Sequence, residues 1–195
     1  MNKRLIIVGK GGHAKVCADI ASQRYDVVEY LDDDLTKNVL GRLQDYEKYV
    51  KDSDFFIAIG DNETRERITN RLRKANVVTL IHNKSVIAKD AIIGKGTVIM
   101  AGVVINSSTV VGAGCIINTC SSLDHDNFVG NYSHISVGAH LAGNVKVGNQ
   151  TFIGAGTTII NNITICDNVI VGAGSVVVKN IDEKGTFFGV PAKKR

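Results

Sequence analysis

No stretch of the 195-residue sequence stays apolar over the length needed to cross a membrane. The one apolar run near the start, Leu5 to Val8, is too short for a signal peptide and ends in glycines. We therefore expect a soluble, cytoplasmic protein without membrane insertion. The length allows one domain of ordinary size or two small ones.

Metal-binding cysteine patterns and strong charge are lacking too. The spacing of the cysteines matches no zinc motif, so we expect reduced thiols and no metal: Cys17, Cys115, Cys120 and Cys166. The net charge is only +4, and the basic residues are scattered except for Lys193-Lys194-Arg195. That charge is too mild for a nucleic-acid reader, so we expect no nucleic-acid partner. Contact with a phosphorylated small molecule is enough to explain it.

A repeat of six residues fills the second half of the chain. Every sixth residue from Ile87 to Val177 is aliphatic, and the residue that follows is often glycine. A period of six fits neither an α-helix nor an alternating strand, but it fits short strands joined by tight corners. Three such turns form one triangular coil, so residues 18 apart in the sequence stack on each other. This pattern predicts a parallel β-solenoid, and a scaffold without chemistry is the alternative reading.

The first half reads as a small α/β unit of the βαβαβ type. We expect a glycine turn after the first strand, and arginines on the outer face of the second helix. The expected strands are Arg4–Val8, Val27–Leu31, Asp54–Ile59 and Val77–Ile81, and the helices run to about Gln23 and over about Glu63–Lys74. The expected domains are residues 1–82, binding a nucleotide sugar, and residues 83–195, the solenoid with a C-terminal tail.

The glycine turn from Gly9 to Ala14 fits the dinucleotide pattern G-x-G-x-x-[G/A], and Asp32 follows about 20 residues later. A dinucleotide fold needs two mononucleotide halves, and this unit has room for one. We therefore expect a nucleotide or nucleotide sugar, with its phosphates at the helix N-terminus near Gly11, Gly12 and His13. A turn that serves packing only is the alternative.

His125 is the candidate general base, because Asp124 and Asp126 flank it and favour the protonated imidazole. Gly143 lies 18 residues later, hence one coil above, where a free backbone N–H could stabilise an oxyanion. The alternative is a solvated corner histidine. His134 and His140 share a phase and could line one face, as in the zinc site of γ-type carbonic anhydrases, but such an enzyme has no use for the N-terminal unit.

The sequence resembles the bacterial hexapeptide-repeat sugar acetyltransferases over essentially the whole chain. The family includes N-acetyltransferases of UDP-4-amino sugars and sialic acid O-acetyltransferases. The matching segments are Gly11–His13, Leu31–Asp33, Phe55–Gly60, Leu80–His82, His134–Gly138, Ala142–Val145, and Asp182–Gly185 through Gly189–Lys193. The resemblance implies a left-handed parallel β-helix, a homotrimer, acetyl-CoA as co-substrate and no metal.

The resemblance also implies roles for single residues. His125 would be the general base and Asp126 the carboxylate that raises its basicity. The residues that would contact acetyl-CoA between subunits are His134, Gly143, Ala155 and Ala173. Those that would hold the UDP-sugar are Gly11, Gly12, His13, Asp32, Asp33 and Gly60. Lys10 and Gly11 differ from the small residues that the family has there.

The expected reaction is transfer of acetyl from acetyl-CoA to the 4-amino group of a UDP-linked amino-dideoxy sugar, by a direct ternary-complex mechanism. One alternative is O-acetylation of a sialic acid or another sugar hydroxyl. Another is a non-catalytic module that binds a nucleotide sugar.

Overall fold

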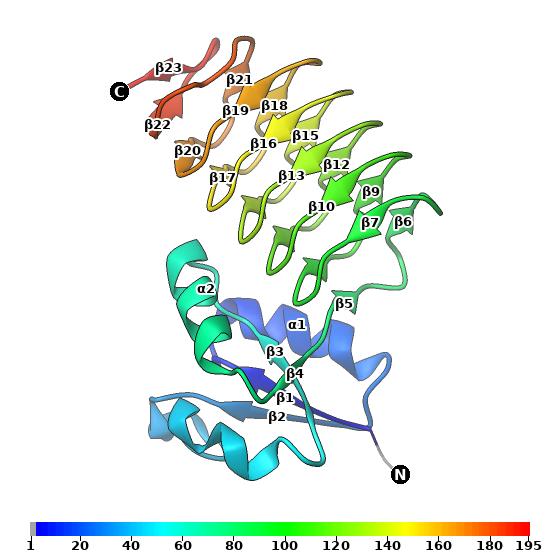
Figure 1. Cartoon of the computed structure of the whole chain (residues 1–195), viewed down its shortest axis with the longest axis vertical. Helices are drawn as coiled ribbons and strands as arrows, with labels where there is room; N and C mark the ends of the chain where they lie inside the picture. Colours follow the sequence, from blue (N-terminus) through cyan, green and yellow to red (C-terminus); the bar gives the residue numbers. More distant parts are fainter. Residues whose placement is uncertain (1–2) are drawn as a thin grey trace.

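The computed structural model describes residues 3–195, which form an α/β unit joined to a long solenoid (Figure 1). The solenoid continues away from the α/β unit, so the C-terminus lies at the end of the molecule that is opposite this unit. No helix within residues 3–195 is long and apolar enough to span a bilayer.

The N-terminal part is a parallel sheet with the strand order β2-β1-β3-β4. Its elements are β1 (Arg4–Val8), α1 (Gly12–Ser22), β2 (Val27–Leu31), the 3-10 helices η1 (Leu35–Lys37) and η2 (Leu43–Tyr49), β3 (Asp54–Ile57), α2 (Asn62–Arg71) and β4 (Asn76–Val77). The residues Leu5, Ile6 and Ile7 of the central strand are fully buried, as expected for a parallel sheet covered on both faces. The expected α/β unit is confirmed, although 3-10 turns replace a helix between β2 and β3.

The last strand expected in this unit, Val77–Ile81, is split in two. Asn76–Val77 pairs with β3, whereas Leu80–Ile81 (β5) pairs with Val98–Ile99 of the solenoid. The solenoid therefore begins at Leu80, because the chain changes sheets at Val78 and Thr79.

Three sheets form the walls of the solenoid, and from β5 to β21 each strand pairs in parallel with the strand 18 residues away. The 5-stranded sheet holds β7, β10, β13, β16 and β19, the 6-stranded sheet holds β6, β9, β12, β15, β18 and β21, and the 8-stranded sheet holds the rest. The strands are β6 (Val86–Ile87), β7 (Ile92–Ile93), β8 (Val98–Ile99), β9 (Val104–Ile105), β10 (Val110–Val111), β11 (Ile116–Ile117), β12 (Ser122–Leu123), β13 (Phe128–Val129), β14 (His134–Ile135), β15 (His140–Leu141), β16 (Lys146–Val147), β17 (Phe152–Ile153), β18 (Thr158–Ile159), β19 (Thr164–Ile165), β20 (Val169–Val171) and β21 (Val176–Val177). The solenoid predicted from the repeat is confirmed.

The aliphatic ladder lines the inside of the coils, and its members from Ile99 to Val177 are almost fully buried. A second inward ladder, four residues after the first, was not expected. It mixes small apolar and polar side chains, and its hydroxyl groups donate to corner carbonyls, as Ser133 Oγ does to Gly148 O at 2.7 Å. These hydrogen bonds let polar groups lie in the core without an unsatisfied donor.

The corners depend on residues in the left-handed backbone region. From Gly96 to Gly174 every sixth residue has a φ near +60°, and where it is not glycine it is most often asparagine. Asparagine tolerates this region better than most residues. At the C-terminal end, β22 (Gly185–Phe188) and β23 (Lys193–Lys194) extend the 8-stranded sheet.

Replacing Ile117 with alanine should lower the free energy of unfolding by about 2–5 kcal/mol, because its side chain is fully buried between Ile99 and Ile135. Chemical denaturation at one fixed protein concentration measures the loss. Val178, which is 39% exposed, is the matched control, and Val178→Ala should change stability by less than about 0.5 kcal/mol. Equal losses in both variants would contradict the assignment of Ile117 to the core.

Candidate active site

His125 lies at the corner between β12 and β13, and its ring points outward. The Nδ1 atom lies 2.7 Å from Oδ2 of Asp126, and the imidazole is 60% exposed. Asp126 is the left-handed residue of this corner, with φ +60°. The corner geometry therefore turns the carboxylate of Asp126 back towards the ring that precedes it.

The hydrogen bond to Asp126 raises the pKa of His125, and the charge of Asp124 adds to the rise. In the neutral imidazole, a proton on Nδ1 that is donated to Asp126 leaves the lone pair on Nε2. The ring is thus a strengthened base with its accepting nitrogen directed away from the carboxylate.

Gly143 lies one coil above His125, as the spacing of 18 predicts. The N–H of Asn144 donates to the carbonyl of His125 at 2.9 Å, which fixes the stacking. A Cβ atom on Gly143 would lie 2.6 Å from both Cε1 and Nε2 of the ring, so the imidazole occupies the space that a side chain would fill. Gly143 is buried against the ring, and its N–H has no acceptor among residues 3–195.

His134 and His140 do not share a face, contrary to the expectation from their spacing. Six residues are one side of the triangle, so β14 lies in the 8-stranded sheet and β15 in the 6-stranded sheet. His140 is exposed and contacts the Ser122 hydroxyl at 2.8 Å. Residues 3–195 hold no group of three or more side chains suited to a metal ion.

His134 is buried where the solenoid meets the α/β unit. Its Nε2 atom lies 3.1 Å from the Asn118 amide, its ring packs edge-on against Phe152, and its Nδ1 atom has no partner in the described chain. Burial, together with the charge of the neighbouring Arg65, lowers the pKa of His134 to about 3. Burial and the charge of Arg65 likewise lower the pKa of His13 to about 4. Both imidazoles are therefore neutral near neutral pH.

The four residues expected to contact acetyl-CoA lie on different sides of the solenoid. Ala155 and Ala173 stack on the corner between the 8-stranded and 6-stranded sheets, where the Gly174 N–H donates to Ala155 O at 2.8 Å. Gly143 lies with His125 on the corner between the 6-stranded and 5-stranded sheets. His134 lies on the 8-stranded sheet, where it is buried. One copy of the chain therefore does not bring these four residues to a common surface.

The residues expected to hold the nucleotide lie at the carboxyl ends of β1, β2 and β3. Gly11, Gly12 and Gly60 have open space in the direction of a Cβ atom, so a ligand can approach their backbone. Gly11 is the N-cap of α1, and His13 lies in its first turn. The three glycines and the helix N-terminus thus form an open surface suited to phosphate.

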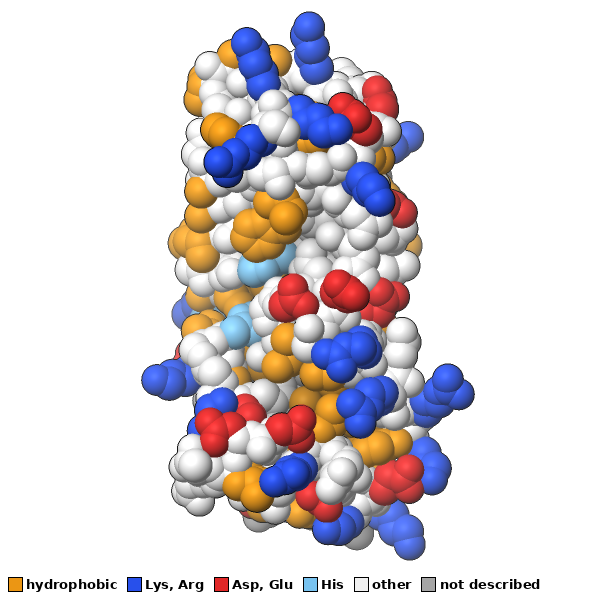
Figure 2. Space-filling view, turned by 90° about the vertical axis from the view of Figure 1, so that its left-hand side faces the viewer, with side chains coloured by type: hydrophobic (Ala, Val, Ile, Leu, Met, Phe, Trp, Pro, Cys, Tyr) orange, Lys and Arg blue, Asp and Glu red, His pale blue; other side chains and the backbone are white. Residues whose placement is uncertain are grey.

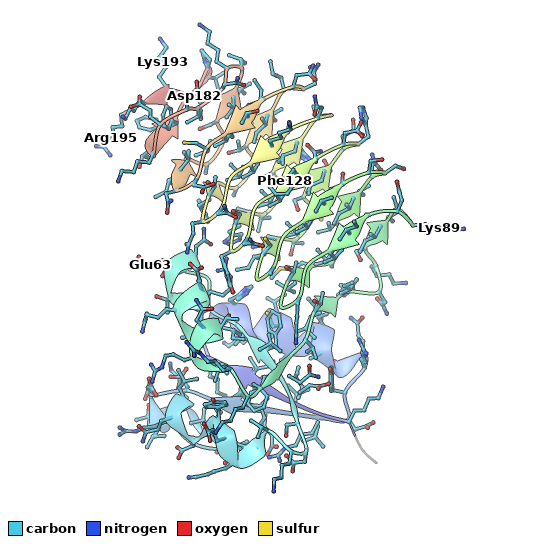
Figure 3. The ribbon with its side chains drawn as sticks, in the orientation of Figure 1. Glu63, Lys89, Phe128, Asp182, Lys193 and Arg195 are labelled. Atoms are coloured by element: carbon cyan, nitrogen blue, oxygen red, sulfur yellow. The ribbon has the colours of Figure 1, made fainter. Side chains whose placement is uncertain are left out.

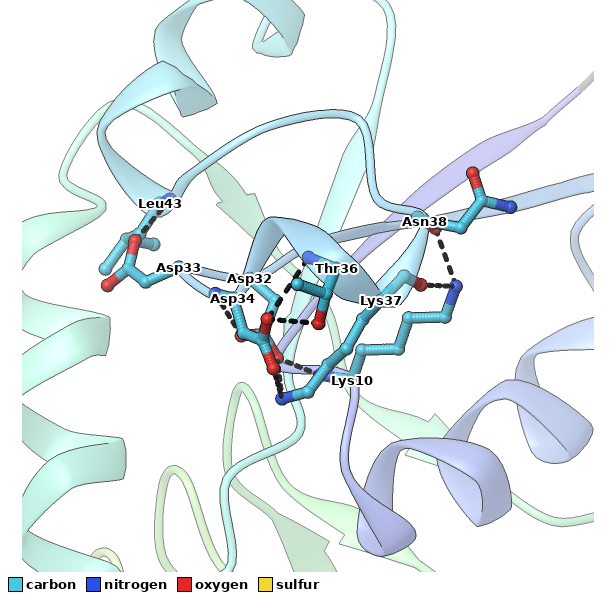
Figure 4. Close-up of polar contacts among 8 residues, drawn as sticks. All are labelled: Lys10, Asp32, Asp33, Asp34, Thr36, Lys37, Asn38 and Leu43. Atoms are coloured by element: carbon cyan, nitrogen blue, oxygen red, sulfur yellow. Dashed lines mark hydrogen bonds and ion pairs between the residues drawn. The ribbon is translucent and has the colours of Figure 1, made fainter.

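Asp32 and Asp33 are already engaged within the protein. The carboxylate of Asp32 accepts the N–H groups of Lys10 at 2.7 Å and Asp34 at 2.9 Å, and it pairs with Lys37 at 3.2 Å (Figure 4). Asp33 accepts the Leu43 N–H at 3.2 Å. These contacts hold the loop after β2 in place, so the two aspartates shape the edge of the nucleotide surface.

Lys10 also supports this loop (Figure 4). Its ammonium group donates to the carbonyl oxygens of Lys37 at 2.6 Å and Asn38 at 2.7 Å, and it lies 4.8 Å from the centre of the Tyr30 ring. The departure from the family at position 10 therefore has a structural role in this chain.

A cleft runs between the start of α2 and the 8-stranded sheet. Of the residues that line it, only Gly60 was expected from the sequence. It is lined by Gly60, Asp61, Asn62, Glu63, Gln150, Phe152, Asn168 and Ile170. Figure 3 places Glu63 at the end of α2 that faces the solenoid. Where the two parts meet, Figure 2 shows histidine side chains next to hydrophobic ones, with acidic groups beside them. Phe152 and Ile170 follow the outward phase of the repeat, and that phase is the signal that could have found them.

The α/β unit and His125 lie on different sides of the solenoid. α1 contacts β5 of the 8-stranded sheet, and α2 contacts the corner between the 5-stranded and 8-stranded sheets through Tyr132 and Gln150. His125 lies on the corner between the 6-stranded and 5-stranded sheets. Within one chain, the candidate base and the nucleotide surface are therefore separated by the body of the solenoid.

Comparisons with known proteins match both parts of the chain. The model of the PglD N-terminal domain matches residues 4–72, and that of the bacterial transferase hexapeptide (six repeats) matches residues 144–179. The acetyltransferase domain of PglB from Neisseria gonorrhoeae FA1090 is 34% identical, with a TM-score of 0.94 over 100% of both chains, and that domain has also been solved with acetyl-CoA. PerB from Caulobacter crescentus, solved with CoA and GDP-perosamine, is 35% identical, with a TM-score of 0.94 over 98% of this chain and 96% of PerB.

A curated relative is the UDP-N-acetylbacillosamine N-acetyltransferase of Bacillus subtilis (strain 168), which is 37% identical over 112 residues. That match covers 51% of this chain and about half of the relative, 52% of its length. The full-length matches at over 30% identity, the two family models and the shared fold establish that the chain belongs to the hexapeptide-repeat sugar acetyltransferases with a PglD-type N-terminal domain.

Proposed function

We propose that the protein transfers an acetyl group from acetyl-CoA to the amino group of a nucleotide-linked amino sugar, and more narrowly to the 4-amino group of a UDP-linked amino-dideoxy sugar. The observation that carries this proposal is the His125 ring, which is held by Asp126 and whose Nε2 atom lies against Gly143 on the coil above. The relatives support the choice of donor and acceptor, because PglB binds acetyl-CoA and PerB binds CoA with a GDP-linked sugar.

In the proposed reaction the sugar amine attacks the thioester carbonyl directly. The N–C bond forms, the Nε2 atom of His125 takes the proton that the amine loses, and the N–H of Gly143 stabilises the oxyanion. The C–S bond then breaks, and the thiolate of CoA leaves and takes up the proton. Asp126 holds the imidazole in the required tautomer through the 2.7 Å contact at Nδ1. No metal and no covalent enzyme intermediate enters these steps.

We propose that the working form is a homotrimer with its sites between subunits. His125 and Gly143 lie on one corner of the solenoid, and Ala155 and Ala173 lie on another. The nucleotide surface belongs to the α/β unit, whose helices contact β5 and the third corner. A neighbouring copy can bring its own Ala155–Ala173 corner and its own nucleotide surface next to His125. One chain alone cannot bring these three parts together. The cysteines, all free thiols, fit the reducing cytoplasm, where we place the enzyme.

A transfer assay with acetyl-CoA and a panel of acceptors tests the proposal. UDP- and GDP-linked amino sugars are compared with the matching hydroxyl sugars and with a sialic acid, and mass spectrometry identifies the acetylated product. We expect N-acetylation of a nucleotide amino sugar. Transfer only to a hydroxyl would favour the O-acetyltransferase, and nucleotide-sugar binding without any transfer would favour a binding module.

The pH dependence of the reaction should report the contact between His125 and Asp126. The base must be neutral to accept a proton, so activity falls as the pH drops through the pKa of His125. Asp126 is the first cause of the raised pKa of His125. In Asp126→Asn the acidic limb of kcat/KM should therefore move to lower pH, and the plateau should fall because the base is weaker.

Asparagine suits this substitution because it keeps the shape of the side chain and tolerates the positive φ of this corner. Asp124→Asn is the matched control, since the charge of Asp124 acts on His125 less than the hydrogen bond of Asp126 does, and its shift should be smaller. An acidic limb that stays in place in Asp126→Asn would show that His125 does not govern the profile.

A further inference from the structure

Arg65 is a buried cation at the junction of the two parts. It is 1% exposed, and it is the only charged side chain that is buried among residues 3–195. The Nε atom donates to Gly114 O at 2.6 Å, Nη1 donates to Ile59 O at 2.9 Å and Gly60 O at 3.0 Å, and Nη2 donates to Asn62 Oδ1 at 2.8 Å and Tyr132 O at 2.9 Å.

These acceptors use all five N–H groups of the guanidinium, yet none of them carries a charge. No carboxylate oxygen in residues 3–195 lies within 4 Å of its nitrogens. The carboxylate whose charge acts on Arg65 is that of Asp61, which is exposed and caps α2 by accepting the Thr64 N–H at 2.9 Å. A charge buried without a counter-charge is costly, and most proteins avoid it.

The surroundings of Arg65 are those of an anion site. Gly60, whose carbonyl Arg65 holds, lines the cleft beside α2 and leaves open space in the direction of a Cβ atom. The N-terminus of α1, an 11-residue helix, carries His13, and the charge of Arg65 lowers the pKa of that histidine and of His134. Two neutral imidazoles and a helix N-terminus add no negative charge. The carboxylates that also line the cleft, Asp61 and Glu63, are exposed, so solvent screens them more than it screens the buried Arg65. The positive potential of Arg65 therefore acts on the space around Gly60.

We propose that Arg65 supplies the counter-charge for the diphosphate of the nucleotide sugar, acting across the Gly60 backbone and without contact with the ligand. The bound ligand thereby compensates a cation that the folded chain leaves unpaired. Arg65 is in this sense a positioning and specificity-determining residue, because it favours ligands that carry a diphosphate and holds the Gly60 carbonyl in place. The inference rests on the proposed function, since it requires the nucleotide to bind at this surface.

Calorimetric binding of UDP and GDP, each compared with its monophosphate, tests the proposal with the full-length protein. The nucleotide that the wild type binds better is used throughout. Arg65→Gln should weaken diphosphate binding by about ten-fold or more, and monophosphate binding by less, since the interaction grows with ligand charge. Arg65→Lys keeps the charge and should keep most of the preference for the diphosphate. Arg67→Gln removes an exposed charge from the same helix, and we expect less than about a two-fold effect.

Asn62→Asp provides a second test, which keeps Arg65 and the shape of the side chain but removes the Nδ2 hydrogen bonds to Gln150 O and Thr151 O. Asn62 Oδ1 already accepts from Arg65, so a carboxylate in its place supplies the missing counter-charge within the fold. We expect Asn62→Asp to reduce the preference for the diphosphate, and to have a smaller effect in the Arg65→Gln background, where there is no cation to neutralise. Because Asn62 also lines the cleft, an equal effect in both backgrounds would mean direct repulsion of the ligand.

The outcomes distinguish a failure of the proposed nucleotide surface from a failure of the role proposed for Arg65. A wild type that binds neither nucleotide would overturn the nucleotide surface itself. A wild type that prefers the diphosphate, with the same preference in Arg65→Gln and in Asn62→Asp, would overturn only the role of Arg65. Uniform weakening of diphosphate and monophosphate in Arg65→Gln would reduce Arg65 to a packing residue.

Discussion

His125→Ala should lower kcat for acetyl transfer by about 10²- to 10⁴-fold, the range over which a positioned general base contributes. The KM values for acetyl-CoA and for the nucleotide sugar should change little, because we assign the ring to proton transfer and the binding of both substrates to other residues. The imidazole is 60% exposed and makes its side-chain hydrogen bond only with the adjacent Asp126, so folding and assembly should be unaffected. Steady-state kinetics of the purified variant measures kcat and KM, and light scattering measures its assembly.

His140→Ala is the matched control, because His140 is also exposed and lies on a strand of the same solenoid. Its contact with Ser122 lies on the 6-stranded sheet, on the strand that leads into the corner of Gly143. We expect near-normal kcat in this variant. Full turnover in His125→Ala with an intact assembly would remove the imidazole from the mechanism.

The sequence was sufficient to predict the solenoid because its information is local and repeated. Each coil needs one aliphatic residue pointing inward and one residue at the corner that accepts a positive φ, and both recur at every sixth position. The stacking of Gly143 on His125 follows from the same arithmetic. The second inward ladder was missed because it mixes hydroxyl, amide, thiol and aliphatic side chains, as Ser133, Asn127, Cys115 and Val145 show.

Other features depend on how the two parts pack, which periodicity does not describe. α2 is polar on nearly every side, so its sequence does not distinguish the buried Arg65 from the exposed Arg67, and arginines were expected on the outer face. His134 looks like one more outward residue of the repeat, yet the α/β unit covers it. The error on His134 and His140 has a simpler geometric cause: a step of six residues turns the chain onto the next face, and only a step of 18 returns it.

Gly143→Ala should reduce kcat by roughly 10²-fold through a single added methyl group, because a displacement of about 1 Å at a reacting group can cost that much. The new Cβ would lie 2.6 Å from two ring atoms of His125, a distance that forces one of them to move. Gly143 does not have a positive φ, so the backbone accepts alanine, and the exposed ring is the part that yields. Thermal unfolding should therefore stay close to the wild type while turnover falls.

A double-mutant comparison shows whether the methyl group acts through the ring. If Gly143→Ala only displaces the imidazole, it should cause no further loss of kcat in a His125→Ala background, where the ring is absent and the space is empty. If the methyl group instead blocks the donor, the KM for acetyl-CoA should rise in both backgrounds, since Gly143 also presents the free N–H. Wild-type kinetics in Gly143→Ala would mean that the ring reacts from a position away from this glycine, and the pairing of base and oxyanion donor would then be wrong.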